Sequence, residues 1–404
     1  MGKIMKKPIF WKKAILSLAA VLVLSACVDP IFFMVSQEMP PRTARIPGAP
    51  TNMVIWRDHL VVASGLRIFT YQHQVWDGSL AIPSPGGRIS MLAATQQFLF
   101  AIVDGTVRRW DGGSWTTVSG GGGGRVQSIF APTTVDAAGQ STNSTILFVG
   151  VGSHVEATSV WQVTGDAPAM NLLVGSSGVL AGVAQVQPGG NFFLAMRYTG
   201  TSAHQSVIDA GHHMGNHVFR WSGTGNVERL TASDVQNGFN GIIAIGDSVV
   251  AIDRLGNLFV VPATGTSFGR RGGYAMDGFA TGVLAVFQHS NDEFAPLLLA
   301  GRQGSLSHAL GARAFTLGYM EIAIPGAPGF NIPGAPPAGN PTSVVNPDRF
   351  PSTIGRRAVS HILQAPANVC SERRLFASTH GQGLWSYRDH FGNGAHDSHW
   401  NAEY

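Results

Sequence analysis

Short apolar stretches separated by glycine-containing turns dominate the chain, and residues 88–119 show this pattern most clearly. The segment reads as four strands divided by Thr-Gln, Asp-Gly and Gly-Gly turns, and the second strand (98–103) is apolar almost throughout. Such turns between apolar or alternating runs are typical of antiparallel hairpins, so the segment predicts one four-stranded antiparallel sheet. A single sheet of this size cannot cover both of its faces. We therefore expect the unit to recur, so that neighbouring sheets bury one another.

An apolar strand followed by a glycine turn and a second strand occurs seven times. Successive units begin 38, 48, 46, 57, 48 and 78 residues apart. Intervals of forty-odd residues are those of propeller blades, so the sequence predicts an all-β fold, a β-propeller of seven four-stranded blades. A pair of β-sandwiches, a β-helix and propellers of six or eight blades are the alternatives. The units begin at Leu60, Phe98, Ile146, Phe192, Val249, Leu297 and Leu375.

Three polar or proline-rich inserts account for the longer intervals, at residues 132–145, 199–215 and 324–351. Because each insert falls between apolar strands, it need not disturb the core of a ring. Long loops on a rigid scaffold are also where binding residues concentrate, and we expect the second and third inserts to form the contact surface. We assign residues 50–404 to a single propeller domain.

Closure of the predicted ring depends on the two ends of this domain. An open propeller exposes two sheet edges, so the last strands, at residues 384–387 and 399–404, are expected to be necessary for closure. The apolar residues 31–35 form a further candidate strand, which would either add to the last blade and close the ring or lie against the membrane surface.

Residues 1–26 have the three parts of an export signal: a basic region ending at Lys13, an apolar run, and small residues before Cys27. The sequence Leu24-Ser25-Ala26-Cys27 resembles the lipobox of bacterial lipoproteins, in which the cysteine sulfur receives a diacylglyceryl group before cleavage. We predict that the mature protein begins at Cys27 and carries several acyl chains such as palmitate, which anchor it without spanning the membrane. Residues 27–49 are rich in proline and read as a tether. The predicted location is the bacterial cell envelope, at the outer membrane.

The formal charge of +4 comes from the signal segment, because all five lysines lie there and no acidic residue does. The remainder has 22 Arg against 23 Asp plus Glu, a net charge near −1. This balance gives no basis for nucleic-acid binding. The absence of lysine after residue 13 also excludes a P-loop, a pyridoxal Schiff base and a Ser-Lys dyad supplied by the folded part.

Histidines are the best candidates for metal binding, and they form two groups in glycine-rich stretches. A zinc site needs three or four ligands that converge within about 2 Å of the metal, and the glycines around the i, i+4 pair His213 and His217 oppose the helix that would use this spacing. Solvated loop histidines are the default interpretation, so no metal site is predicted. The six candidates are His212, His213, His217, His390, His396 and His399.

Other chemistry is weakly represented. The chain has no Gly-x-Ser-x-Gly elbow and no recognisable carboxylate pair, and we predict no catalytic residues and no cofactor. The five glycines at 120–124 precede another strand, so they read as a flexible linker between blades. With Cys27 lipidated, Cys370 has no partner for an intrachain disulfide and is expected to be a buried, inert thiol, with a reactive thiol as the alternative.

The lipobox, the all-β repeat layout and the residue usage together resemble a treponemal paralogous family of surface lipoproteins, described as fibronectin- and laminin-binding adhesins. The resemblance extends along the whole chain in layout, and Cys27 is the residue that it carries over. It implies a surface adhesin, involved in virulence, that binds host extracellular-matrix glycoprotein.

Two function classes follow for a propeller. A binding module displays loops on a rigid ring, whereas an enzyme needs polar groups that converge on the central channel. The sequence favours the binding module, because charged residues and histidines fall in the inserts while the strands expected to line the channel look apolar. A periplasm-facing scaffold in outer-membrane assembly and a propeller enzyme are the alternatives.

Overall fold

The computed structural model describes the chain from residue 46 to residue 403, with gaps. The described residues are 46, 48–135, 141–152, 158–165, 169–197, 217–232, 235, 238–245, 248–253, 256–262, 264–269, 279–287, 297–303, 318–323, 359–379, 383–387 and 400–403. They belong to one compact unit, Ala44–Glu403. Across these ranges, none of the helices combines the length and the apolar character that crossing a membrane requires.

Antiparallel sheets succeed one another along the chain. The first contains β1 (Met53–Trp56), β2 (His59–Ser64), β3 (Arg67–Gln72) and β4 (Val75–Trp76). The second contains β5 (Ile89–Ala94), β6 (Leu99–Val103), β7 (Thr106–Trp110) and β8 (Trp115–Thr117). The third contains β9 (Val126–Phe130), β12 (Ile146–Val151), β13 (Thr158–Thr164) and β14 (Asn171–Ser177).

The fourth sheet contains β15 (Val179–Gln185), β16 (Phe192–Arg197), β17 (His217–Trp221), β18 (Glu228–Ala232) and, parallel to β18, β22 (Ser267–Phe268). The fifth contains β19 (Phe239–Ile245), β20 (Ser248–Asp253) and β21 (Leu258–Val261). The sixth contains β23 (Phe279–Phe287), β24 (Leu297–Gln303) and β25 (Gly318–Ala323). The seventh contains β26 (Val359–Ala365), β27 (Arg374–Thr379), β28 (Gly383–Tyr387) and β29 (Trp400–Ala402), with α4 (Ala367–Cys370) between its first two strands.

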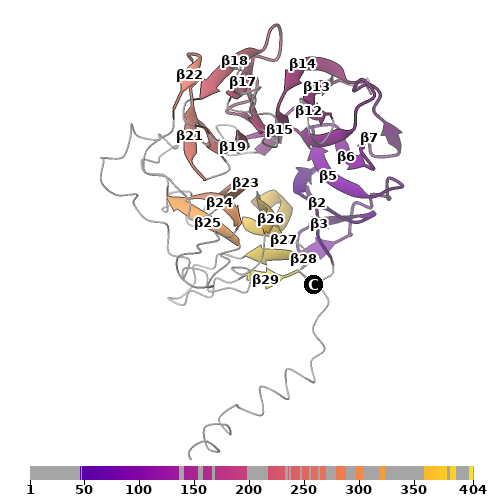
Figure 1. Cartoon of the computed structure of the whole chain (residues 1–404). Coiled ribbons are helices and arrows are strands. Elements are labelled where there is room, and N and C mark those ends of the chain that lie inside the picture. The colour runs from indigo at the N-terminus through magenta and orange to yellow at the C-terminus, as the bar shows by residue number, and fades with distance from the viewer. Residues whose placement is uncertain are drawn as a thin grey trace, which may run out of the picture. The chain divides into compact units, whose positions relative to one another are not determined.

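The sheets are arranged in a ring in chain order, with the first strand of each sheet innermost (Figure 1). Each pair of neighbouring sheets shares one cluster of buried apolar side chains, and the described residues contain seven such clusters. Burial of apolar surface stabilises the folded state by about 25 cal/mol for each Å². Because each sheet buries apolar side chains against the sheet on either side, both neighbours stabilise it. The predicted β-propeller is therefore confirmed.

Hairpins between the second and third strands follow from local sequence. In the second sheet, Asp104 and Gly105 have φ angles of 50° and 84°, and two positive values are those of a type I′ turn. Asp and Gly are residues that adopt this conformation at low cost, and the turn sets the register in which Val103 pairs with Thr106. The predicted sheet within residues 88–119 is confirmed by β5 to β8.

Other details differ from the predictions. Four strands per blade do not hold throughout, because the fifth and sixth sheets have three described strands and the fourth has five. The repeat unit that begins at Leu297 was expected to supply two strands joined by a glycine turn. In the sixth sheet, β24 instead pairs with β25, which begins at Gly318. The insert at 132–145 contains a hairpin of β10 (Thr133–Val135) and β11 (Ser141–Asn143). The glycines at 120–123, read as a linker between blades, all have positive φ and form a turn in which Gly121 is buried near Met170 and Val151 while its neighbours are exposed.

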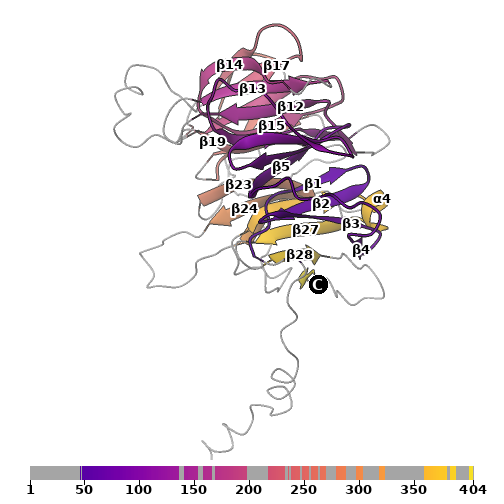
Figure 2. The same ribbon diagram turned by 90° about the vertical axis from the view of Figure 1, so that its right-hand side faces the viewer.

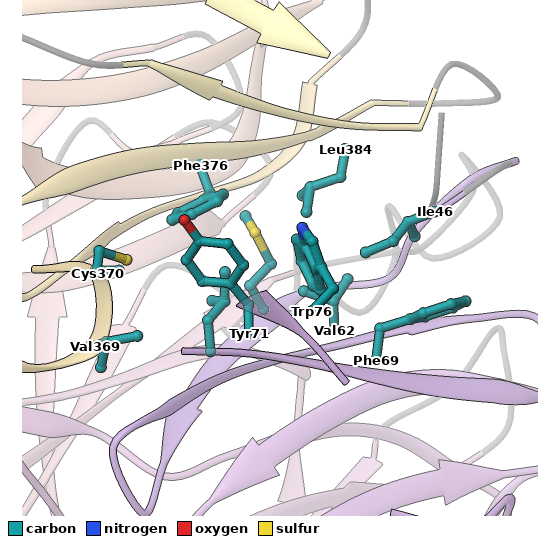
Figure 3. Packing of buried hydrophobic residues seen from close by; sticks show 12 residues of the cluster. Ile46, Val62, Phe69, Tyr71, Trp76, Val369, Cys370, Phe376 and Leu384 are labelled. Carbon is teal, nitrogen blue, oxygen red and sulfur yellow. The ribbon is translucent and has the colours of Figure 1, made fainter. Parts of the chain in front are cut away.

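The first and last sheets lie side by side in both views (Figures 1 and 2) and share one apolar cluster. Figure 3 shows Tyr71 between Trp76 and Phe376, with ring centroids 4.8 and 5.5 Å away. The buried Arg374 donates from Nη1 to the Tyr71 hydroxyl at 2.5 Å, which ties the seventh sheet to the first. Ile46 completes the cluster from before the first strand.

The strands of the seventh sheet all come from the C-terminal part of the chain. The predicted strands at 384–387 and 399–404 are present as β28 and β29. The candidate strand at 31–35, the signal segment and the inserts at 199–215 and 324–351 lie outside the described residues.

Candidate functional site

The seven innermost strands surround a central cavity of about 2260 Å³. Every sheet contributes its first strand to the wall: β1, β5, β9, β15, β19, β23 and β26. All seven strands run in the same direction along the cavity, because each begins a sheet of the same topology. We call the end of the cavity where they begin the starting end, and the opposite end the finishing end. The cavity is the candidate binding site, since it is the place where residues from all sheets converge.

Most inner strands carry a β-bulge near the starting end. In β5, for example, Ile89 pairs with Val103 but Met91 pairs with Ile102, so Ser90 is an extra residue. A bulge redirects side chains, and the five extra residues all line the cavity. We call them the bulge ring: Ser90, Gln127, Ala181, Asn240 and Ser360.

Charged side chains gather at the starting end. Arg88 and Arg125 immediately precede β5 and β9, and Arg197 pairs with Val179, the first residue of β15. All three arginines are exposed and line the cavity, and we call them the arginine rim. The acidic lining residue among those described is Asp104, whose turn adjoins the beginning of β5. Arg373 lies at the finishing end, because it precedes Arg374, the partner of the last residue of β26.

One histidine, His361, lies in the cavity wall on β26. The backbone N–H of Met53 donates to its Nδ1 at 3.2 Å, which links the first sheet to the seventh at the inner edge. A nitrogen that accepts this bond carries no proton, so the neutral ring has its proton on Nε2. Burial lowers the pKa of His361 from 6.5 to about 4, because the charged form loses hydration.

Short contacts between neighbouring inner strands hold the wall in place. Asn52 donates from Nδ2 to the carbonyl oxygen of Leu92 and accepts from the backbone N–H of the same residue, at 2.6 and 2.7 Å. Between β19 and β23 the backbones touch, since a Cβ on Gly241 would lie 2.4 Å from the carbonyl oxygen of Gly282. The cavity is therefore surrounded by strands fixed to one another, and it is a preformed site.

The residues singled out by sequence lie mainly elsewhere. Cys27, His212, His213, His390, His396 and His399 are outside the described residues. His217 is the first residue of β17, and Cys370 is a buried thiol at the end of α4, as expected. Within the described ranges, no three potential metal ligands come together.

The expectation that charged residues and histidines fall in the inserts while the channel strands look apolar is corrected at two places: His361 lies on the inner strand β26, and the arginine rim lines the cavity from residues next to the inner strands. A sequence signal existed for two of these residues: Arg88-Ile89-Ser90 and Arg125-Val126-Gln127 are equivalent triplets at the beginning of successive inner strands. His361 had no such signal. Its role depends on the contact between the first and last sheets, 308 residues apart in sequence.

No family model matches the chain, and no curated protein matches its sequence. Solved structures match the fold. The WD40 β-propeller domain of Doa1 is 9% identical, with 86% of this chain and 95% of that chain covered and a TM-score of 0.51. YCF48 from Cyanidioschyzon merolae is 12% identical, with 84% and 95% covered and a TM-score of 0.49. At this level of identity the likeness concerns the fold, and this chain is a β-propeller scaffold with a preformed central cavity.

Proposed function

We propose that this protein is a lipid-anchored binding protein of the bacterial envelope that performs no catalysis. The anchor is the acylated Cys27, and the propeller is the binding module. Its partner is an extracellular-matrix glycoprotein, fibronectin or laminin, which makes the protein a surface adhesin. The lipobox and the family resemblance support this proposal.

The observation that carries the proposal is the position of the strands that the second insert joins. β16 ends at Arg197 and β17 begins at His217, and both positions lie at the starting end of the cavity. The described residues on either side of this insert, Arg197 and His217, therefore lie at the same end of the cavity as the arginine rim. A long insert next to a preformed site supplies additional contact residues for a large partner.

Binding of the full-length protein, purified in detergent, to immobilised fibronectin and laminin tests the proposal. Albumin serves as the control surface. We expect saturable binding that is lost when residues 199–215 are replaced by a short Gly-Ser turn. Replacement of residues 136–140, which follow β10 and precede β11 in the sequence, is the matched control, because β9 ends and β12 begins at the finishing end.

Absence of binding by the parent protein would reject the adhesin function. Protease treatment of intact cells then distinguishes the alternatives. Cleavage before permeabilisation establishes surface exposure, whereas full protection would point to a periplasm-facing scaffold. Equal binding by the 199–215 and 136–140 variants would move the contact surface away from the starting end.

A further inference from the structure

The starting end of the cavity carries an imbalance of charge that neighbouring residues do not neutralise. Arg88 and Arg125 are both exposed, and neither guanidinium forms an ion pair or hydrogen bond with another described residue. Asp104 is the acidic lining residue among those described, and it forms no ion pair with either arginine. Two guanidinium groups at the opening of a cavity are thus available to a ligand from solution.

The backbone fixes these three residues beside one another. The N–H of Asp104 donates to the carbonyl oxygen of Arg88 at 3.2 Å, and the N–H of Val126 donates to the carbonyl oxygen of Gly105 at 2.9 Å. The Arg125 side chain lies over this turn, since a Cβ on Gly105 would come within 2.7 Å of its Cγ. The two arginines therefore flank the Asp104 turn on rigid strands, with little freedom of the backbone to lose on binding.

The bulge ring lies directly inside these arginines. Ser90 and Gln127 each follow a rim arginine by two residues and line the same cavity, and Ser90 is exposed. The Ser90 hydroxyl can donate to and accept from the main chain of a ligand, whereas Gln127 Nε2 donates to the carbonyl oxygen of Gly152 at 3.1 Å and so helps to form the wall. A ligand bound here would meet guanidinium groups at the opening and neutral hydrogen-bonding groups further in.

We propose that the starting end of the cavity binds an extended acidic polypeptide segment of a protein partner. Arg88 and Arg125 each hold a carboxylate, a planar group that a guanidinium binds with two parallel hydrogen bonds. Ser90, two residues after Arg88 and exposed in the cavity, contacts the main chain of the segment. Sites for sulfated polysaccharides use runs of basic residues, and beyond residue 13 this chain has no run longer than two.

This inference names a site and a ligand chemistry, and it does not require the partner to be a matrix glycoprotein. A partner from the periplasm with an acidic segment would use the same residues. The two proposals can therefore fail separately: loss of matrix binding leaves the acidic-peptide site intact, and loss of the acidic-peptide site leaves matrix binding through the inserts intact.

Fluorescence polarisation with the full-length protein in detergent tests the site. The probes are a labelled ten-residue peptide of alternating Glu and Ser and a matched peptide with Gln in place of Glu. We expect the Glu peptide to bind about tenfold more tightly than the Gln peptide at low salt, with the difference shrinking in high salt. Arg88→Gln and Arg125→Gln should each weaken binding of the Glu peptide about threefold, and the double variant about tenfold.

Two further variants separate recognition from folding. Asp104→Asn removes the acidic residue between the arginines and should strengthen Glu-peptide binding about twofold, a gain that misfolding cannot produce. Asn suits this turn, because it tolerates the positive φ of 50° found there. Arg373→Gln removes the same charge at the finishing end and should leave the affinity unchanged.

Equal affinity for the Glu and Gln peptides would overturn the inference. So would a loss in the Arg373 variant as large as in the rim variants, since binding would then follow overall charge. A heparin oligosaccharide provides the last comparison. If the rim variants weaken heparin binding and leave Glu-peptide binding unchanged, the site belongs to a polysaccharide and the peptide proposal is wrong.

Discussion

Substitution of His361 by Asn tests how much the titration of this one side chain contributes to the loss of stability at acidic pH. Asn places an oxygen near the position of Nδ1, so it can still accept the hydrogen bond from the Met53 N–H, but it does not titrate. The parent protein keeps the imidazole neutral because protonation would break this bond and place a charge in the half-buried wall.

The magnitude follows from the displaced pKa. The pKa of His361 falls from 6.5 in an unfolded chain to about 4 in the propeller. A folded-state pKa below the unfolded value means that the contribution to stability is complete above pH 6.5 and is lost as the pH falls toward 4. At about 1.4 kcal/mol for each pKa unit, the loss is about 3 kcal/mol as an upper limit, because the ring borders a water-accessible cavity.

Chemical unfolding of both proteins at pH 7.5, 6, 5 and 4 measures this loss. Carboxylates that titrate in the same interval contribute equally to both proteins and cancel in the difference. We expect the parent to lose up to about 3 kcal/mol more than His361→Asn between pH 6.5 and 4. Parallel curves for the two proteins would show that His361 does not titrate at the contact between the first and seventh sheets, and the reasoning would fail.

Three further changes test other parts of the structure. Cys27→Ser should abolish partitioning into detergent, and a variant that stays with membranes after a high-salt wash would place the anchor elsewhere. Arg374→Met leaves the Tyr71 hydroxyl without its buried donor and should lower the free energy of unfolding by about 3 kcal/mol, as measured by denaturant titration; a change below about 1 kcal/mol would contradict this. Gly241→Ala forces a Cβ against the backbone of β23 and should cost about 2 kcal/mol, whereas Gly175→Ala, which meets no atom within 4 Å, serves as the control.

The second and third strands of each sheet were the most predictable part of the fold. The second strand is buried on both faces, so it appears as a continuous apolar run such as residues 98–103, and a tight turn joins it to the third strand in the second sheet. Information of this kind is local, and a single sequence contains it. The sixth sheet shows the limit, because β24 and β25 are separated by 14 residues that obscure the hairpin.

The inner strands were less predictable because some of their side chains pack between sheets and others line the water-accessible cavity. In β9, Val126 and Ile129 are buried between sheets while Gln127 lines the cavity, and the bulge interrupts the alternation that would have revealed this. Which residues line the cavity depends on how seven strands curve around a common centre. The arginine rim was missed for this reason, although Arg88 and Arg125 occupy equivalent positions in consecutive repeats.

Closure of the ring brings two side-chain hydrogen bonds to the contact between the first and seventh sheets, from Arg374 to Tyr71 and from Met53 to His361. The described strands of the seventh sheet are all C-terminal, so no strand is shared across this contact, and side-chain packing together with a few hydrogen bonds holds it. Six other contacts join sheets that are close in sequence, whereas this one joins residues about 300 positions apart and carries a larger entropy cost of loop closure. Apolar burial alone tolerates sliding of one sheet past another, but the Arg374–Tyr71 and Met53–His361 hydrogen bonds are satisfied in one register only. These bonds therefore fix the register in which the first and seventh sheets meet, and with it the closed wall of the cavity at Met53 and His361.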